Sequence, residues 1–225
     1  MSGTTMAHMT TISKLTAARL YGIIDLGYAS AENIERVAAQ MCEGGVQMIQ
    51  LRAKGHDEHF IEELANRIQP ILAAAGVPFI INDHPELVPS VGADGAHVGQ
   101  DDLAVSDARW RAGRALADEV PLPLIGKSTH SIEQAVAAAE SGADYIGFGP
   151  LFPTPTKAGR AAIGLADIAR VHKLVSIPIF CIGGIKLSNL RDVLAAGAKR
   201  VVIVSGILQA ADIAAHCREI RATLD

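Results

Sequence analysis

The feature that most constrains the fold is a regular alternation between short β-branched runs and longer alanine-rich runs. The short runs are typical of strands and the alanine-rich runs of helices. Because most of the short runs are apolar almost throughout, they indicate a parallel sheet that is buried on both faces. The pattern predicts eight strands, each followed by a helix, over residues 20–25, 46–52, 78–83, 95–98, 123–128, 145–149, 178–183 and 200–205.

Eight strand–helix units in 225 residues predict an α/β fold, a single (β/α)8 TIM barrel. A doubly wound open sheet is the alternative, although the first strand-to-helix turn lacks a dinucleotide-binding glycine pattern. Several predicted helices end in a glycine, as at Gly76, Gly142 and Gly197, where the left-handed conformation can close a helix. We divide the chain into a flexible N-terminal leader over residues 1–17 and a barrel domain over residues 18–225.

Composition and charge exclude several classes of protein. A net charge of −4 argues against a protein whose main partner is nucleic acid. No apolar run reaches the roughly 18 residues of a membrane-spanning helix, and the N-terminus lacks the apolar core of a signal peptide. Cys42, Cys181 and Cys217 are too scattered for a disulfide framework, so we expect small buried residues in a reducing compartment. Together these features predict a cytoplasmic protein.

Two carboxylates follow consecutive predicted strands, at the end of the barrel where this fold carries its active sites. Asp83 follows the third strand and Asp102 follows the fourth. Neighbouring strands lie about 4.8 Å apart, so the two side chains could share one Mg²⁺ with substrate phosphates. Each could instead cap a turn, and the spacing alone does not choose between Asp101 and Asp102.

Cationic and small residues at the same strand ends favour a phosphorylated ligand. The cations at the ends of three predicted strands are Arg52, Lys54, Lys127 and Lys157. An arginine suits bidentate phosphate binding, and a lysine supplies a point charge. Gly183-Gly184 and Ser205-Gly206 follow the last two strands, where loops of this fold often bind phosphate. Glycine also serves tight turns without any ligand.

Other polar residues exclude some chemistries. No Cys/His cluster has zinc spacing, and Ser128 lacks the pattern of a hydrolase nucleophile. His97 lies within a short apolar strand and is predicted to be satisfied inside the barrel rather than bound to metal. The loop over residues 149–164 contains three prolines and is interpreted as a lid over the substrate.

Seven motifs in order along the chain resemble those of the thiamine-phosphate synthase (thiamine-phosphate pyrophosphorylase) family. The resemblance runs from about Tyr21 to the last helix, and its most distinctive segment is Thr154-Pro155-Thr156-Lys157. The motifs are Gln50-Leu51-Arg52-Ala53-Lys54, Asn82-Asp83, Gly95-Ala96-His97-Val98-Gly99-Gln100-Asp101-Asp102-Leu103, Ser128-Thr129-His130-Ser131, Gly147-Phe148-Gly149-Pro150-Leu151-Phe152-Pro153-Thr154-Pro155-Thr156-Lys157, Ile182-Gly183-Gly184-Ile185 and Val204-Ser205.

The resemblance implies a transferase of thiamine biosynthesis with Mg²⁺ as cofactor. In that reaction 4-amino-2-methyl-5-(diphosphooxymethyl)pyrimidine condenses with a thiazole phosphate, or its carboxylated form, to give thiamine phosphate and diphosphate. The resemblance implies that Asp83 and Asp102 hold Mg²⁺, which favours Asp102 over Asp101. It further implies Gln50, Arg52, Lys54, Asn82, Ser128 and Lys157 for the pyrimidine diphosphate, Thr154, Thr156, Gly184, Val204 and Ser205 for the thiazole phosphate, and Arg52, Lys54, Ser128 and Lys157 as the catalytic set.

The implied chemistry agrees with this set of side chains. Loss of diphosphate would leave a pyrimidine-stabilised methylene cation for the thiazole nitrogen to attack. Such an enzyme needs charge stabilisation and water exclusion rather than a nucleophile of its own. We expect phosphorylated pyrimidine and thiazole substrates as partners, with no nucleic acid and no membrane, and we leave a homo-oligomer open.

Two other functions were weighed against this one. A thiazole tautomerase shares the fold, but the intact loop over residues 152–157 and the two aspartates argue against it. A phosphate-sensing barrel without catalysis would have little use for a metal pair, a set of cations and a lid together. Three positions depart from the family pattern: His84 where arginine is common, Lys127 where an apolar residue is common, and Gly206 where alanine is common.

Overall fold

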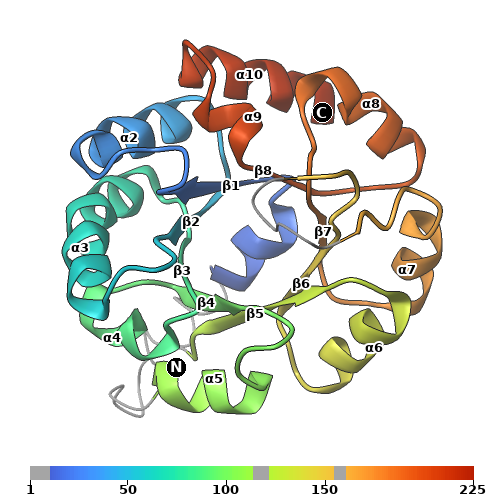
Figure 1. The fold of residues 1–225 in the computed structure, drawn as a ribbon, viewed down its shortest axis with the longest axis horizontal. Coiled ribbons are helices and arrows are strands. Elements are labelled where there is room, and N and C mark those ends of the chain that lie inside the picture. Colours follow the sequence, from blue (N-terminus) through green and yellow to red (C-terminus); the bar gives the residue numbers. More distant parts are fainter. Residues whose placement is uncertain (1–10, 114–121, 155–160) are drawn as a thin grey trace.

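The computed structural model describes residues 11–113, 122–154 and 161–225, and it contains a closed barrel of eight parallel strands. The strands follow one another around the barrel in chain order, as Figure 1 shows from one end. The predicted (β/α)8 barrel is therefore confirmed. The strands are β1 (Leu20–Asp25), β2 (Met48–Arg52), β3 (Phe79–Asn82), β4 (Gly95–Val98), β5 (Leu124–Thr129), β6 (Tyr145–Phe148), β7 (Ile179–Cys181) and β8 (Val201–Ile203).

Helices surround the barrel as an outer ring (Figure 1). Within the described residues they are η1 (Ala31–Asn33), α2 (Ile34–Glu43), α3 (Glu58–Ala75), η2 (Pro85–Leu87), α4 (Val88–Val91), α5 (Val105–Gly113), α6 (Ile132–Glu140), α7 (Ile168–Leu174), α8 (Leu187–Ala195), α9 (Ser205–Leu208) and α10 (Ile213–Leu224). The short helix α9 begins inside the range expected for the last strand, because β8 already ends at Ile203. Gly76 closes α3 in the left-handed conformation, with a φ of 65°.

The apolar core has two parts. The larger part lies between the strands and the helices, and it gathers the buried faces of the surrounding helices. The smaller part fills the inside of the barrel and includes Met48, Leu124 and three aromatic rings, those of Tyr21, Tyr145 and Phe180. The ring centroids lie 5.4 to 6.0 Å apart in edge-on contacts. This filling gives the polar end of the barrel a rigid floor.

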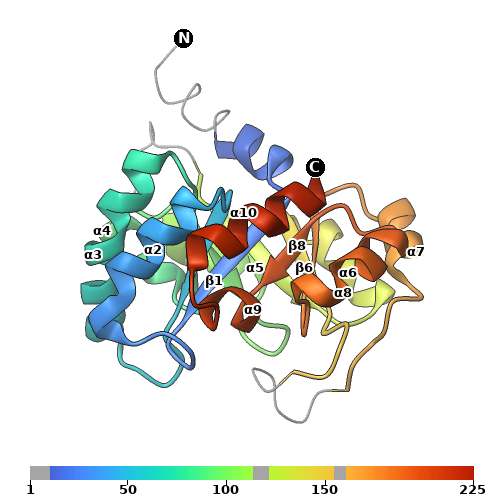
Figure 2. The same ribbon diagram turned by 90° about the horizontal axis from the view of Figure 1, so that it is seen from above.

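The prediction of a flexible leader over residues 1–17 is wrong for residues 11–17, which form a helix. Leu15 is only 2% exposed and packs into the apolar cluster inside the barrel, next to Ala18. Arg200 donates a hydrogen bond to the carbonyl of Thr16 at 2.7 Å. Figure 2 shows this helix (blue) over one end of the barrel. Two buried apolar residues three positions apart and a hydrogen bond to Thr16 therefore hold this mostly polar segment against the barrel.

The cysteines agree only in part with the expectation that all three are buried. Cys181 and Cys217 are buried, as predicted, whereas Cys42 is half-buried. In the described parts of the chain all three are free thiols, and burial raises the pKa of Cys181 and Cys217 to about 12. No helix among the described residues is both long and apolar enough to cross a membrane.

Candidate active site

The site residues that the structure describes lie at the C-terminal ends of the strands and in the loops that follow them. Gln50 and Arg52 belong to β2, and Ser128 belongs to β5. Asn82 is the last residue of β3, so Asp83 is the first residue of the next loop. The barrel thus brings together residues that lie far apart in the sequence. They line two adjoining cavities.

The larger cavity, which we call the charged cavity, has a volume of about 450 Å³. It lies over the ends of β1 to β5 and contains most of the residues predicted for the pyrimidine diphosphate and the metal. The polar residues that line it are Asp25, Gln50, Arg52, Lys54, Asn82, Asp83, His97, Gln100, Asp101, Asp102, Ser128 and His130.

Asp83 is the most perturbed carboxylate of the charged cavity. Its φ of 62° places it in the left-handed region, which aspartate tolerates better than most residues. Its backbone N–H donates to the carbonyl of His97 at 2.9 Å, which fixes the turn to β4. Burial raises the pKa of Asp83, and the negative charge of Asp102 raises it further. Lys54 opposes this effect, with Nζ 3.7 Å from Oδ2 of Asp83.

Asp102 approaches this pair from the loop after β4. Its Oδ2 accepts a hydrogen bond from the backbone N–H of Gly99 at 2.8 Å, so the carboxylate does close its own turn. The turn-capping interpretation and the metal interpretation are compatible, because each carboxylate has a second oxygen. The repulsion between Asp83 and Asp102 is what a shared cation would relieve.

Arg52 is held by a residue that the sequence analysis did not select. Asp25, at the end of β1, is almost fully buried, and its Oδ2 accepts from a guanidinium nitrogen of Arg52 at 2.7 Å. Its other oxygen accepts from the backbone N–H of Gly27 at 2.9 Å. The sequence offers a signal for Asp25, because it is a polar residue at the end of a predicted strand, as are the residues that were selected.

A chain of buried hydrogen bonds crosses the barrel beneath the charged cavity. Gln50 donates to the Tyr21 hydroxyl at 2.6 Å, and that hydroxyl lies 3.2 Å from the hydroxyl of Tyr145. Tyr145 lies 3.3 Å from Nδ1 of His97, and Nε2 of His97 lies 3.0 Å from Oγ of Ser128. The prediction that His97 is satisfied inside the barrel is confirmed. The chain orients Gln50 and Ser128, the two residues at its ends.

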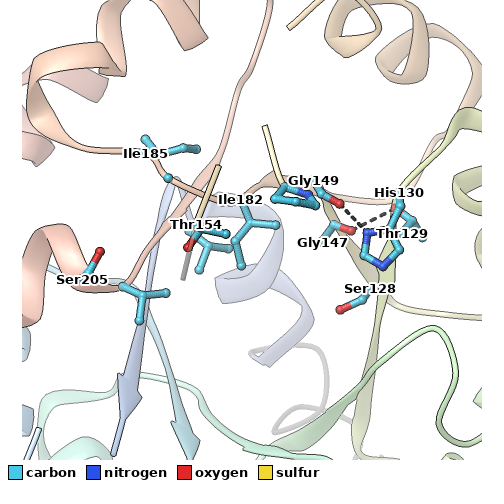
Figure 3. A pocket seen from close by; sticks show the side chains of 14 residues that line it. Ser128, Thr129, His130, Gly147, Gly149, Thr154, Ile182, Ile185 and Ser205 are labelled. Atoms are coloured by element: carbon cyan, nitrogen blue, oxygen red, sulfur yellow. Dashed lines mark hydrogen bonds between the residues drawn. The ribbon is translucent and has the colours of Figure 1, made fainter. Parts of the chain in front are cut away.

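The smaller cavity, which we call the glycine-lined cavity, has a volume of about 50 Å³ and lies over β5 to β8 (Figure 3). Its lining includes Thr154, Gly184, Val204 and Ser205, as predicted for the thiazole phosphate. It has four residues in common with the charged cavity, namely Ser128, His130, Ile182 and Val204. The two cavities therefore meet at β5 and β8.

Glycine is required in this cavity for two reasons. Gly184 has a φ of 67°, which a side chain rarely adopts. A Cβ atom there would lie 2.7 Å from Cβ of Phe152, in the segment after β6.

His130 contacts the carbonyl of Gly149 through Nδ1 and so connects the end of β5 to the segment after β6 (Figure 3). A further opening of about 320 Å³ leads outward past Thr154, Gly184 and Ser205.

Two predicted residues, Thr156 and Lys157, lie outside the described residues. Most of the predicted lid does too, because the loop over residues 149–164 is described only up to residue 154 and from residue 161. Every other predicted site residue lines one of the two cavities. Lys127 does not line either of them, although it was counted among the cations.

The fold and these cavities define a class of protein: a (β/α)8 barrel whose polar cavities lie at the C-terminal ends of its strands, where enzymes of this fold carry their active sites. A family model for thiamine monophosphate synthase matches residues 20–207. The chain therefore belongs to the thiamine monophosphate synthase family. It is a transferase of thiamine biosynthesis, of the thiamine-phosphate synthase type, as the relatives described next support.

The relatives cover almost the whole chain. Thiamine-phosphate synthase of Thermus thermophilus is 42% identical over 198 residues, which are 87% of this chain and 89% of that protein. The enzyme of Shouchella clausii is 38% identical over 208 residues, 92% of this chain and 96% of its own. Among solved structures, thiamine phosphate pyrophosphorylase from Pyrococcus furiosus is similar with a TM-score of 0.80 and 29% identity, covering 95% of this chain and 97% of its own.

A more distant structure, 3-hexulose-6-phosphate synthase, has a TM-score of 0.65 at 20% identity, with 92% of this chain and 100% of that chain covered. At that identity the similarity concerns the fold alone. These matches give no support to the tautomerase alternative.

Proposed function

We propose that the protein joins 4-amino-2-methyl-5-(diphosphooxymethyl)pyrimidine to a thiazole phosphate, or to its carboxylated form with loss of CO2, with the help of Mg²⁺. The observation that carries the proposal is the pair of adjoining cavities. One cavity presents carboxylates, Arg52 and Lys54, and the other presents hydroxyls and glycines. Since the two cavities meet at Ser128 and Val204, the reacting carbon of one substrate would face the ring nitrogen of the other there.

The donors around Asp83 fit Mg²⁺. This cation prefers oxygen ligands and is commonly held by one or two carboxylates together with substrate phosphates. Asp83 and Asp102 supply the carboxylates; burial raises the pKa of Asp83, and the nearby charge of Asp102 raises it further, so a cation between them would favour the ionised form. A bound Mg²⁺ would supply positive charge to the diphosphate and lower the cost of its departure.

The side chains of this protein would then act as follows. Arg52, held by Asp25, and Lys54 contact the diphosphate and stabilise the charge that grows on it as the carbon–oxygen bond breaks. The bond electrons leave with the diphosphate, and the cation that remains on the pyrimidine methylene is attacked by the thiazole nitrogen. Ser128 and Gln50, oriented by the buried hydrogen bonds, hold the pyrimidine in place. Lys157 also contacts the diphosphate in this proposal.

The glycine-lined cavity would hold the thiazole phosphate. Thr154 and Ser205 offer hydroxyl groups, and Gly184 allows the ligand to approach the backbone closely. Thr156 serves the same phosphate in this proposal. The glycine-lined cavity itself is too small for the whole molecule, so the phosphate end would extend into the outward opening that Thr154, Gly184 and Ser205 also line.

A direct assay tests the proposal. Purified protein is mixed with the two substrates and Mg²⁺, and thiamine phosphate and diphosphate are measured over time. We expect the two products to form in equal amounts. A parallel sample contains EDTA, and we expect product only where Mg²⁺ is present. No product above the enzyme-free control would refute the function, and equal rates with EDTA would refute the metal. A cytoplasmic location and the oligomeric state stay predictions.

A further inference from the structure

Lys127 is a lysine in the middle of a strand that is otherwise buried throughout. It belongs to β5, where it lies opposite Val98 of β4, and only 7% of it is exposed. Lysine is almost never this buried unless its charge is paired or bonded. The two cavities do not account for it, because it lines neither.

The contacts of Lys127 lie at the two ends of one loop. Its Nζ donates to the carbonyl of Gly99 at 2.7 Å and to the carbonyl of Leu103 at 2.8 Å. The loop between these two residues carries Asp101 and Asp102. Within the loop, the backbone N–H of Asp102 also donates to Gly99 at 3.3 Å, and its carboxylate accepts from Gly99. One ammonium group therefore joins the start of the loop to its end.

The ionisable groups around Lys127 are negatively charged and attract its ammonium group. Burial lowers the pKa of Lys127, while the carboxylates of Asp102, Asp101 and Asp83 raise it. The lysine and these carboxylates thus attract one another across the loop. An apolar side chain at this position would take the ammonium donor from the carbonyls of Gly99 and Leu103, of which Gly99 keeps the N–H of Asp102, and it would remove one positive charge from the neighbourhood of the proposed metal ligands.

We propose that Lys127 is a positioning residue, which fixes the loop from Gly99 to Leu103 so that Asp102 faces Asp83. The inference rests on the proposed function, since it concerns the metal pair of that site. Residues that orient metal ligands from behind typically change metal affinity by about 10- to 100-fold when they are replaced. Lys127 should act in this way on a cation held by Asp83 and Asp102.

The test compares Lys127→Met with Lys127→Arg and with Lys173→Met, which replaces an exposed lysine of α7. Methionine has a similar length but no charge and no donor, whereas arginine keeps both. Binding of Mn²⁺ in the presence of inorganic diphosphate is followed by electron paramagnetic resonance. We expect Lys127→Met to weaken Mn²⁺ binding about tenfold, while Lys127→Arg recovers much of the loss and Lys173→Met equals the wild type.

Steady-state kinetics supply the second measurement. Lys127→Met should need more Mg²⁺ for half-maximal rate, with the KM for thiazole phosphate unchanged. If the wild type makes thiamine phosphate and Lys127→Met binds Mn²⁺ as tightly as the wild type, the inference is overturned and the proposed function stands. A wild type that makes no product overturns the proposed function and the inference with it. Should the methionine variant not fold, Lys127→Gln, which keeps a donor without the charge, takes its place in both measurements.

Discussion

The two cavities at the mouth of the barrel differ in the chemical groups that they present to a bound substrate. The charged cavity is proposed to hold the diphosphate and presents ionised side chains, whereas the glycine-lined cavity, with the opening beside it, is proposed to hold the thiazole phosphate and presents hydroxyls and backbone. A diphosphate that leaves during the reaction gains negative charge, and cationic side chains held in place or a metal ion stabilise that charge. A phosphate that only anchors its substrate undergoes no such change, so hydroxyl and backbone donors, with Lys186 at the adjoining opening, can hold it.

The two cavities also differ in what keeps them in shape. Side chains of the charged cavity are held by other buried side chains, as Asp25 holds Arg52 and as Tyr21 holds Gln50. The glycine-lined cavity is held by backbone geometry, with Gly184 packed closely against Phe152. A substitution in one cavity should therefore affect one substrate much more than the other. The predictions below test this separation, beginning with the largest effect.

Replacement of Asp83 should have the largest effect. Asp83→Asn keeps the shape and tolerates the left-handed backbone at this position, with a φ of 62°, so the fold should persist. It removes one of the two charges proposed to hold Mg²⁺, and we expect the rate to fall by about 100-fold or more. Asp101→Asn, on the neighbouring loop, is the matched control. Equal losses in both variants would show that the charged cavity acts through its overall charge and not through a defined pair.

Replacement of Asp25 should have a smaller effect, confined to one substrate. Asp25→Asn leaves Arg52 without an ionised partner in a place where the arginine side chain is only 18% exposed. We expect the KM for the pyrimidine diphosphate to rise by roughly tenfold, with the KM for thiazole phosphate unchanged. Glu35→Gln, which breaks an ion pair with Arg67 between α2 and α3, provides the control and should leave both values as they are. A rise in both KM values for Asp25→Asn would contradict the separation of the cavities.

Replacement of Gly184 should show the reverse pattern. Gly184→Ala places a methyl group 2.7 Å from Cβ of Phe152, at a φ of 67°. We expect the KM for thiazole phosphate to rise several-fold and stability to fall by about 1 kcal/mol. Gly142→Ala is matched in backbone, with a φ of 86°, but nothing lies within 4 Å of its methyl group. It should lose less stability, because only its backbone is strained, and keep both KM values, as thermal unfolding and steady-state kinetics would show.

The sequence predicted the barrel well because the strands and helices alternate with different periodicities. The sequence also places Arg52, Lys54, Asp83 and Asp102 after strands, and the barrel brings these side chains to one cavity. Arg52 was selected, but its partner Asp25 was not: the place of Asp25 at a strand end can be read from the sequence, whereas its ion pair with Arg52 follows from packing. Lys127 was counted among the cations that could share an anion, with its role left open, and in the structure its side chain points to the backbone of a loop. The direction in which a side chain points and the extent to which it is buried depend on packing, and residue types alone do not predict them.

The N-terminal helix was missed for a similar reason, and it supplies the last prediction. Residues 11–17 contain few apolar residues, and only their contact with the barrel makes the segment helical. Leu15→Ala removes a side chain that is 2% exposed within the cluster containing Tyr21 and Tyr145. We expect the free energy of unfolding in urea to fall by about 2 kcal/mol. Because this cluster lies beneath both cavities, neither KM should change relative to the other. A change in the KM of one substrate only would show that the apolar cluster supports one cavity more than the other. It would contradict the expectation that the cluster supports both cavities equally.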